Sequence, residues 1–386
     1  MKTIFDIYSK EDIENRIIQI NELLKQNLSD NEILSQLDFE MKEELFSIAK
    51  ARIKSSKEGR KHIEEIKYLN LEDLRFSTPT DAADYRAKRL QCSKIIDLCS
   101  GIGVQSAAFS KECKEVYAFE IDERKVAYAE ENFKKKNLHF FQGDVLSKEI
   151  IGKIKEIKPD IIFCDPERLE SEKERNLDSI APNIKKLIEI YSKITENICI
   201  EIPPQIDLEK LKELGDFEAE YLSYNNKLNR LNVYFGKLKQ AELSAADVLG
   251  YKIIKNEKIK SFQANEPLRY VYECSTAVAK ADLENEICQE LKADILNEKP
   301  LLVTSKEFIE NPLAKAFELL GIADDFESTV RALRKFNIGK VVLRQNIDPK
   351  EYWQERKKYE MKLTGKEEAH LFVLEKMNIV CKEIKI

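Results

Sequence analysis

Two glycines follow a short apolar run in a pattern that suits the binding of a ligand. The run KIIDL (94–98) continues into DLCSGIGVQS (97–106), which leads to a segment rich in small residues. Gly101 and Gly103 let the backbone turn tightly and approach a bound molecule closely, because neither residue has a Cβ. Such a turn is a weak signal by itself, since an ordinary structural turn has the same composition.

Two carboxylates further along the chain make the pattern more specific. Glu120 lies nineteen positions after Gly101, at the end of the next apolar run. Its side chain could accept hydrogen bonds from both ribose hydroxyls of an adenosine. Asp144 ends the third run, where its side chain could bind an adenine amino group while the backbone N–H of Val145 reaches a ring nitrogen. The spacing therefore predicts a ligand that contains adenosine.

These residues need elements that bring the ends of several apolar runs together. From residue 94 onward, runs of strand length alternate with segments of helical periodicity, which predicts right-handed βαβ units and a parallel sheet covered on both faces. The carboxyl ends of parallel strands meet at one edge of the sheet, where doubly wound folds bind ligands. The predicted strands are 94–98, 115–122, 138–144, 158–167 and 196–204.

The regions on either side of this sheet predict two further parts. Apolar residues at three- and four-residue spacing predict helices over residues 10–70. Two runs flanking Asn225-Asn226-Lys227 predict an antiparallel hairpin that ends the sheet. The expected domains are a helical N-terminal domain (1–70), a central α/β domain (71–240) and an α+β C-terminal domain (241–386).

The motifs resemble those of class I S-adenosylmethionine-dependent methyltransferases. DLCSGIGVQS is similar to their glycine motif, FEID (119–122) to the ribose motif, GDV (143–145) to the adenine motif and DPER (165–168) to the catalytic loop. A dehydrogenase-type GxGxxG is absent, because Ser106 occupies the last glycine position. The resemblance implies a Rossmann-like class I methyltransferase sheet with S-adenosyl-L-methionine as cofactor. The cofactor contacts it implies are Asp97, Cys99, Gly101, Gly103, Glu120, Asp122, Asp144, Val145 and Asp165.

A narrower resemblance runs from about residue 60 to the end of the chain. RFSTPTDAADYRAKRL (75–90), YVYECSTAVAKADL (270–283) and KVVLRQNIDPKEYWQERKKYEMKL (340–363) look like segments of class I methyltransferases with a C-terminal THUMP-like domain. In that family the catalytic loop typically reads DPARR and the last domain typically contains KKRG, so DPER and LRQN depart from the pattern. By analogy to true THUMP proteins, the resemblance implies an RNA substrate, with a tRNA or rRNA base as the target.

The DPER loop is the candidate catalytic site. Enzymes that methylate amino groups hold the target NH₂ with an Asp or Asn side chain and a backbone carbonyl of a [DN]PP[YF] loop, and Asp165 and Pro166 could do the same. Glu167 could be a general base or a solvent-facing loop residue. Arg168 could hold a phosphate or a carboxylate, or cap the loop through a salt bridge. Cys164 could be a nucleophile, but its side chain should point away from that of Asp165 in a strand, which favours a packed thiol.

The composition limits the other functions that the chain could have. Its net charge is −6, so a surface for nucleic acid must be local. None of the eight cysteines forms a CxxC pair, and no zinc-type spacing occurs, so we expect reduced thiols and no metal. The first residues lack the apolar core of a secretory signal, and no run has the length of a membrane span. We therefore expect a cytoplasmic protein.

Other residues leave alternatives open. Tyr85 and Arg86 could cover the methionine end of the cofactor or belong to a helix packed on the sheet edge. Trp353 and Tyr359 could stack bases or pack in a core. The chain could also be a catalytically silent RNA- or protein-binding module, or a small-molecule methyltransferase. Basic residues that could contact RNA or form a solvated face are Arg331, Arg334, Lys335, Lys340, Arg344, Arg356, Lys357, Lys358, Lys362 and Lys366.

Overall fold

The computed structural model describes residues 2–58, 66–168, 177–344 and 347–385, without the side chains of Lys57, Glu58, Arg168 and Asp178. The chain divides into two compact units. Among the described helices, none has the length and apolar composition needed to cross a membrane. Unit 1 comprises Met1–Ala219 and Arg230–Gln240, and unit 2 comprises Glu220–Asn229 and Ala241–Ile386.

Unit 1 begins with helices whose apolar residues share one core. Ser9 starts the first of them, because its Oγ accepts a hydrogen bond from the backbone N–H of Asp12 (3.1 Å), and Ser29 forms a capping box at the start of the second. The apolar faces of these helices pack together with Ile102 and Tyr128, which follow later in the chain. The helices of this core are α1 (Lys10–Leu24), α2 (Asp30–Gln36), α3 (Lys42–Glu58) and α4 (Leu71–Phe76). Helix α5 (Thr80–Arg89) follows, and its Ala83 and Ala87 belong to the core of the sheet.

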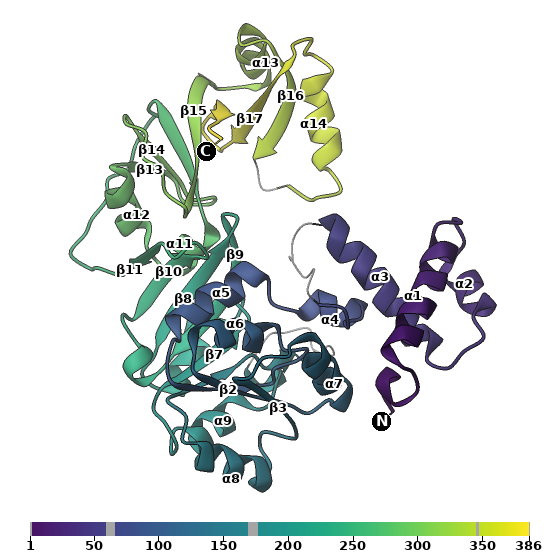
Figure 1. The fold of residues 1–386 in the computed structure, drawn as a ribbon. Coiled ribbons are helices and arrows are strands. Elements are labelled where there is room, and N and C mark those ends of the chain that lie inside the picture. Colours follow the sequence, from purple (N-terminus) through teal and green to yellow (C-terminus); the bar gives the residue numbers. More distant parts are fainter. Residues whose placement is uncertain (1, 59–65, 169–176, 345–346, 386) are drawn as a thin grey trace. The chain divides into compact units, whose positions relative to one another are not determined.

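A mostly parallel sheet forms the centre of unit 1. Its strand order is β3-β2-β1-β4-β7-β9, and only β9 runs antiparallel to its neighbour β7. Helices α5, α6 and α7 lie on one face of the sheet and α8 and α9 on the other, as Figure 1 shows. The strands are β1 (Lys94–Leu98), β2 (Glu115–Glu120), β3 (Leu138–Gln142), β4 (Ile161–Cys164), β7 (Ile198–Ile202) and β9 (Lys227–Tyr234). The remaining elements are α6 (Val104–Glu112), α7 (Glu123–Asn132), α8 (Lys148–Ile157), α9 (Ile184–Tyr191), α10 (Leu208–Leu211), β5 (Glu167–Arg168) and β6 (Ile180–Ala181).

The boundary between the two units runs through a hairpin. It joins β8 (Glu218–Tyr224) to β9, and the two strands are neighbours in the sheet. Asn225 and Asn226 both have backbone φ angles in the left-handed region, 52° and 56°. A two-residue turn of this kind matches the twist of the flanking strands, and asparagine tolerates it better than most residues. The predicted Rossmann-like sheet with its terminal hairpin is confirmed.

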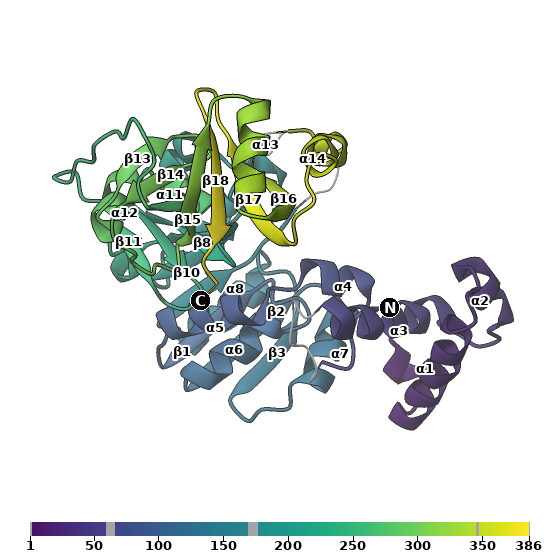
Figure 2. The ribbon, with the colours of Figure 1, turned by 90° about the horizontal axis from the view of Figure 1, so that it is seen from above.

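Unit 2 contains a seven-stranded sheet of order β13-β14-β12-β15-β18-β17-β16. Only β16 and β17 pair in parallel. Helices α13 and α14 share a core with β16 and β17, and Figure 2 shows them on the same side of the sheet. The seven strands are β12 (Tyr270–Cys274), β13 (Asp294–Asn297), β14 (Leu302–Ser305), β15 (Ala314–Ala323), β16 (Ile338–Arg344), β17 (Glu367–Val373) and β18 (Asn378–Glu383). Strands β10 (Leu243–Asp247) and β11 (Lys252–Ile254) lie outside this sheet and follow β8 in the order β8-β10-β11. The helices are α11 (Thr276–Lys280), α12 (Glu284–Leu291), α13 (Phe326–Lys335) and α14 (Tyr352–Glu360).

Two central strands of unit 2, β15 and β18, lack a clear alternation of apolar and polar residues that would predict a strand. The longest strand, β15, reads AKAFELLGIA, in which apolar residues do not alternate with polar ones. Both of its neighbours, β12 and β18, pair with it through the backbone, so long-range pairing rather than a local pattern defines the strand. The last strand, β18, follows β17 after a short turn and carries only six residues.

Candidate active site

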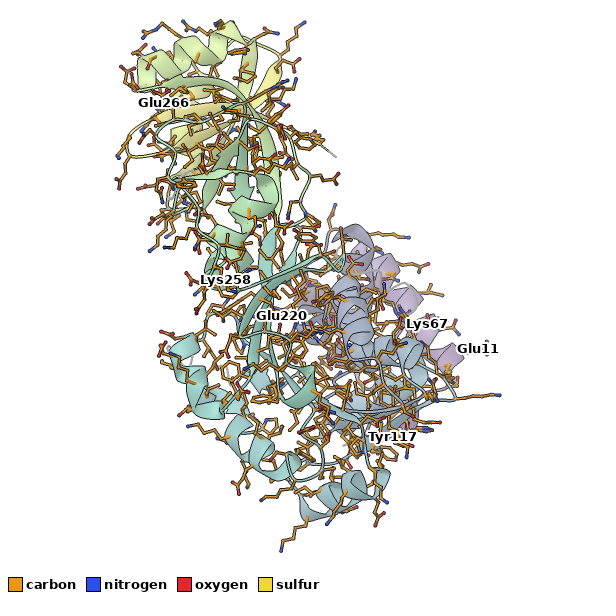
Figure 3. The ribbon with its side chains drawn as sticks, turned by 90° about the vertical axis from the view of Figure 1, so that its left-hand side faces the viewer. Glu11, Lys67, Tyr117, Glu220, Lys258 and Glu266 are labelled. Atoms are coloured by element: carbon orange, nitrogen blue, oxygen red, sulfur yellow. The ribbon has the colours of Figure 1, made fainter. Side chains whose placement is uncertain are left out.

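A cavity of about 620 Å³ lies at the carboxyl edge of the parallel sheet in unit 1. Its walls come from the ends of β1, β2, β4 and β7, from the loop after β3 and from α4 with the segment that follows it. Tyr117 marks β2 in Figure 3, among the side chains of the sheet that leads to this edge. The volume falls within the range of about 300–1,000 Å³ that is usual for small-molecule sites. This edge is the place where the strand pattern predicts a ligand.

Asp97 lines the cavity, and only one of its two carboxylate oxygens accepts a hydrogen bond from a described residue. Its side chain is fully buried, and Ser106 Oγ donates a hydrogen bond to Oδ2. Among the described residues, none donates a hydrogen bond to Oδ1. Burial raises the pKa of Asp97 to about 7, and the nearby carboxylate of Asp165 adds to that rise. A buried acceptor of this kind calls for a donor from a ligand, and a cationic donor fits best.

The glycine loop combines close packing with open space. Cys99, Gly101 and Gly103 all have positive φ angles, of 62°, 57° and 83°. A Cβ on Gly103 would lie 2.9 Å from the Phe140 ring, so this glycine allows helix and sheet to pack closely. A Cβ on Gly101 would meet nothing within 4 Å, and Gly101 lines the cavity together with Cys99. The structure thus places Gly103 behind the cavity wall and Gly101 on its surface.

Glu120 is held at the end of β2 by backbone N–H groups. Its side chain is only 6% exposed. Oε2 accepts a hydrogen bond from Gly101 (2.8 Å), and Oε1 accepts from Ile121 (2.9 Å) and Asp122 (3.1 Å). Glu120 lines the cavity, whereas Asp122 caps α7 by accepting from the N–H of Arg124 (2.8 Å) and is not part of the described wall.

The loop after β3 forms the next part of the wall. Asp144 and Val145 both line the cavity, and the Asp144 side chain is exposed there. One carboxylate oxygen of Asp144 accepts a hydrogen bond from the N–H of Leu146 (2.9 Å). The carbonyl of Val145 accepts from Tyr191 Oη (2.6 Å), which ties the loop to α9. This tie fixes the loop that the sequence assigns to the adenine ring.

The DPER segment lies at the end of β4 and faces the same cavity. Asp165, Pro166 and Glu167 line it, with Asp165 half-buried and Glu167 exposed. Backbone pairing of Glu167 with Ala181 joins β5 to β6 and holds this segment in place. The side chain of Arg168 lies outside the described part of the chain, so its predicted anion contact stays a prediction.

Cys164 precedes this segment and packs in the sheet. Its side chain is fully buried, with Sγ 4.0 Å from Cys99 Sγ. Burial raises the pKa of the Cys164 thiol well above its ordinary value, which opposes formation of the thiolate that a nucleophile needs. The geometry therefore agrees with a packed thiol.

The sequence analysis missed a buried charge network at the end of β7. Glu201 is 6% exposed and lines the cavity. Its Oε2 pairs with Arg86 Nη2, and its Oε1 lies 2.5 Å from Arg230 Nε. Arg86 is fully buried and also donates to Gln105 Oε1 (2.7 Å), so it packs against the sheet. Arg86 is not among the residues that line the cavity, which favours the alternative of a helix packed on the sheet edge. The signal for the network was the single acid in the apolar run ICIEI.

Helix α4 and the short segment after it form a wall that sequence reasoning also missed. Asp73, Arg75 and Phe76 line the cavity, and the Phe76 ring is 48% exposed. Arg124 of α7 holds this segment, because its Nη1 and Nη2 lie 2.8 and 3.1 Å from the two carboxylate oxygens of Asp73. An exposed aromatic ring in a cavity wall suits a flat apolar ligand.

Comparisons with known proteins agree with this geometry. Residues 92–239 match the family of RNA cap guanine-N2 methyltransferases. Residues 92–239 are an S-adenosylmethionine-dependent methyltransferase domain. The whole chain is similar in fold to a proposed methyltransferase from Porphyromonas gingivalis W83, with a TM-score of 0.74 and 18% identity over 98% of this chain and 100% of that one.

Two other solved structures resemble only part of the methyltransferase. A DNMT2 variant from Spodoptera frugiperda has a TM-score of 0.31 and 17% identity over 44% of this chain and 62% of its own. A methyltransferase from Thiobacillus denitrificans, in complex with S-adenosyl-L-homocysteine, has a TM-score of 0.24 and 18% identity over 32% of this chain and 48% of its own. At these scores the likenesses carry no argument.

The cofactor of the methyltransferase domain is S-adenosyl-L-methionine, and the cavity fits it. The unsatisfied Oδ1 of Asp97 suits the amino group of the methionine part, which is a cation. Glu120 and Asp144 offer carboxylates that suit the ribose hydroxyls and the adenine amino group. In the described residues, no group of three or more His, Cys, Asp or Glu side chains could hold a metal ion.

Proposed function

We propose that this methyltransferase transfers a methyl group to the exocyclic amino group of a guanine in RNA. The observation that supports it most is that Asp165 and Pro166 line the same cavity as Asp97, Glu120 and Asp144. The family that residues 92–239 match is described as acting on guanine N2, an exocyclic amino group. Hydrogen-bond acceptors that suit a target amino group therefore line the same cavity as hydrogen-bond acceptors that suit the cofactor.

Three carboxylates of the chain hold the cofactor. When bound, S-adenosyl-L-methionine supplies a methyl group on a sulfonium, which is a good leaving group. Asp97 accepts hydrogen bonds from the amino group through Oδ1, which lacks another donor among the described residues. Glu120 accepts from the ribose hydroxyls and Asp144 from the adenine amino group. Gly101 adds no side-chain atom to the part of the cavity wall that it forms.

The end of β4 orients the target. The carboxylate of Asp165 and the carbonyl of Pro166 accept the two N–H bonds of the amino group, which directs its lone pair toward the methyl group. Glu167 is exposed on the cavity wall and takes up the proton that the methylated nitrogen loses. Phe76, half-exposed on the same wall, offers a flat apolar surface to a purine ring.

Unit 2 serves as the RNA-binding part in this proposal, and we assign it the THUMP-like role. Residues 326–366 contain eleven Lys and Arg and only five Asp and Glu, although the chain as a whole is acidic. A local cationic surface on an acidic protein supports recognition of a polyanion.

The test is transfer of tritiated methyl groups to total RNA from a strain that lacks the gene. RNA is digested to nucleosides after the reaction, and we expect the label in N2-methylguanosine. Asp165→Ala, assayed in parallel, should give no label. Label in a different nucleoside would contradict the amino-group assignment. Label only in a small molecule, or none in RNA, protein or small molecules, would instead support one of the two alternative functions.

A further inference from the structure

Unit 2 carries an exposed basic face on two neighbouring helices. Residues 326–366, which include α13 and α14, have a net charge of +6 in a chain of net charge −6. Arg344, which the sequence groups with these cations, lies in the sheet instead, with Nη1 3.2 Å from Glu273 Oε2 and Nε 3.2 Å from His370 Nδ1. The basic face consists of the exposed residues Arg331, Arg334 and Lys335 on α13 and Lys357, Lys358 and Lys362 on or just after α14.

Direct contacts keep the two helices together. The rings of Phe326 and Tyr359 lie 4.8 Å apart, and both residues belong to the core beneath the helices. Arg334 donates to the carbonyl of Lys362 through Nε (2.9 Å) and Nη2 (2.7 Å). The carboxyl-terminal end of α13 is therefore joined to the segment just after α14, which brings Arg334 beside Lys362.

The only tryptophan of the sequence lies on this surface. Trp353 is 67% exposed on α14, although tryptophan is usually buried to a large extent. Arg356 lies with its guanidinium carbon 5.3 Å from the centre of the indole, and Tyr352 contacts the indole edge-on at 5.6 Å. Arg356 is itself fixed by Glu360, whose Oε1 is 2.8 Å from Nε. The indole thus has a cation over one face and Tyr352 beside it, and most of its surface stays open to solvent.

We propose that α14 and the basic face bind a single-stranded segment of RNA, with a base stacked on Trp353 and phosphates at the lysines and arginines. Aromatic platforms beside cations are the usual means of binding single strands. A lipid surface fits less well, because Trp353 and Met361 are the only large apolar residues of this region with high exposure in the described chain. This inference rests on the proposed function, since it takes the substrate to be RNA.

The fluorescence of Trp353 tests the inference in the full-length protein. The probe is an unstructured RNA oligonucleotide of mixed sequence, and we expect saturable quenching of the emission. The logarithm of the association constant should fall linearly with the logarithm of the salt concentration, since each phosphate contact in a single strand contributes a slope of about −0.7.

Two sets of variants sharpen this test. Replacing Lys357, Lys358 and Lys362 together by Gln should flatten the salt slope by about two units, because three contacts are lost. Lys299, Lys306 and Lys376 are exposed in unit 2 outside the basic face, and replacing them by Gln serves as the matched control. Trp353→Ala should weaken binding of a labelled oligonucleotide about tenfold, and Trp353→Phe should weaken it less.

The outcomes separate this inference from the proposed function. RNA that binds without quenching, with equal slopes for both lysine triples, would place the RNA surface elsewhere and overturn the inference. Quenching by vesicles that contain phosphatidylserine, without a response to RNA, would also overturn it. If RNA quenches Trp353 but receives no methyl group, the proposed function fails alone. If RNA is methylated but does not change the fluorescence of Trp353, the inference about this surface is wrong and the proposed function is not affected.

Discussion

The two units of the chain use charge in opposite ways. In unit 1, Asp97, Glu120 and Glu201 are at most 6% exposed and face one cavity. In unit 2, the cations of the basic face are exposed on the surface. Buried and fixed charges act strongly at short range, which suits the orientation of a cofactor and a target atom. Exposed charges are screened by salt, which suits affinity for a polyanion but not chemistry.

The largest expected effect is on cofactor binding in unit 1. Gly101→Val should weaken S-adenosyl-L-methionine binding at least about a hundredfold, or about 2.7 kcal/mol, because its side chain would project into the cavity at a positive φ of 57°. Calorimetry should show one site in the wild type. Gly152→Val is the control, since Gly152 is exposed on α8 with open space around it. If Gly101→Val binds S-adenosyl-L-methionine as tightly as the wild type, the cofactor does not bind at this loop.

Loss of the Asp165 carboxylate, which orients the target amino group in this proposal, should lower kcat much more than it changes the affinity for the cofactor. We expect Asp165→Ala to lower kcat by about 10²–10⁴-fold, the usual range for a positioned polar catalyst. Cofactor affinity should stay within about tenfold of the wild-type value, which corresponds to about 1.4 kcal/mol. Asp165→Asn keeps one acceptor oxygen and should retain more activity. A normal rate for Asp165→Ala would show that the target is held elsewhere.

The buried ion pair of unit 1 should matter mainly for stability. Arg86→Met leaves Glu201 in the interior without one of its two cations, and we expect a loss of about 3–5 kcal/mol in the free energy of unfolding. The double variant Arg86→Met/Glu201→Gln should lose less stability than the sum of the losses of the two single variants, because the contact that the two side chains share is removed only once. Urea unfolding followed by circular dichroism measures both. If Arg86→Met is as stable as the wild type but binds the cofactor poorly, Arg86 covers the cofactor after all.

A smaller effect is expected when pH is varied, on the affinity of unit 1 for S-adenosyl-L-methionine. Because burial raises the pKa of Asp97 to about 7 in the free protein, a cationic amino group must displace a proton from it at lower pH. Affinity for S-adenosyl-L-methionine should therefore rise about tenfold per unit as pH approaches 7 from below and then level off. The same shift means that the contribution of Asp97 to folding stability falls as pH rises from about 4 to 7.

The control for this pH dependence is Asp97→Asn, which has no proton to release. Its affinity should be lower and should vary little between pH 5.5 and 7.5 by the same linkage argument, with the bounds chosen about 1.5 units below and 0.5 above the pKa. Calorimetry in two buffers of different ionisation enthalpy would detect the released proton in the wild type. An equal pH profile in both proteins would show that Asp97 does not meet the amino group.

The sequence predicts the parts of the fold and site that depend on local patterns. The glycine loop and the acids Glu120, Asp144 and Asp165 could be predicted from the sequence, because a parallel sheet brings the ends of its strands together. Glu201 was missed because it lies in an apolar run and its partner Arg86 is 115 positions away. Phe76 was missed as a wall residue because its place depends on how Arg124 holds Asp73. Strand β15 lacks alternation, so only its pairing partners reveal it.

The central claim is that unit 1 performs the chemistry and unit 2 supplies RNA affinity. Methyl transfer measured as a function of RNA concentration tests it most directly, with saturating cofactor. We expect Asp165→Asn to lower kcat while the RNA concentration for half-maximal rate stays near the wild-type value. The variant with Lys357, Lys358 and Lys362 replaced by Gln should show the reverse, a raised half-maximal concentration and an unchanged kcat. If both variants change the same parameter, or if the lysine variant matches the wild type, the division of roles between the two units is contradicted.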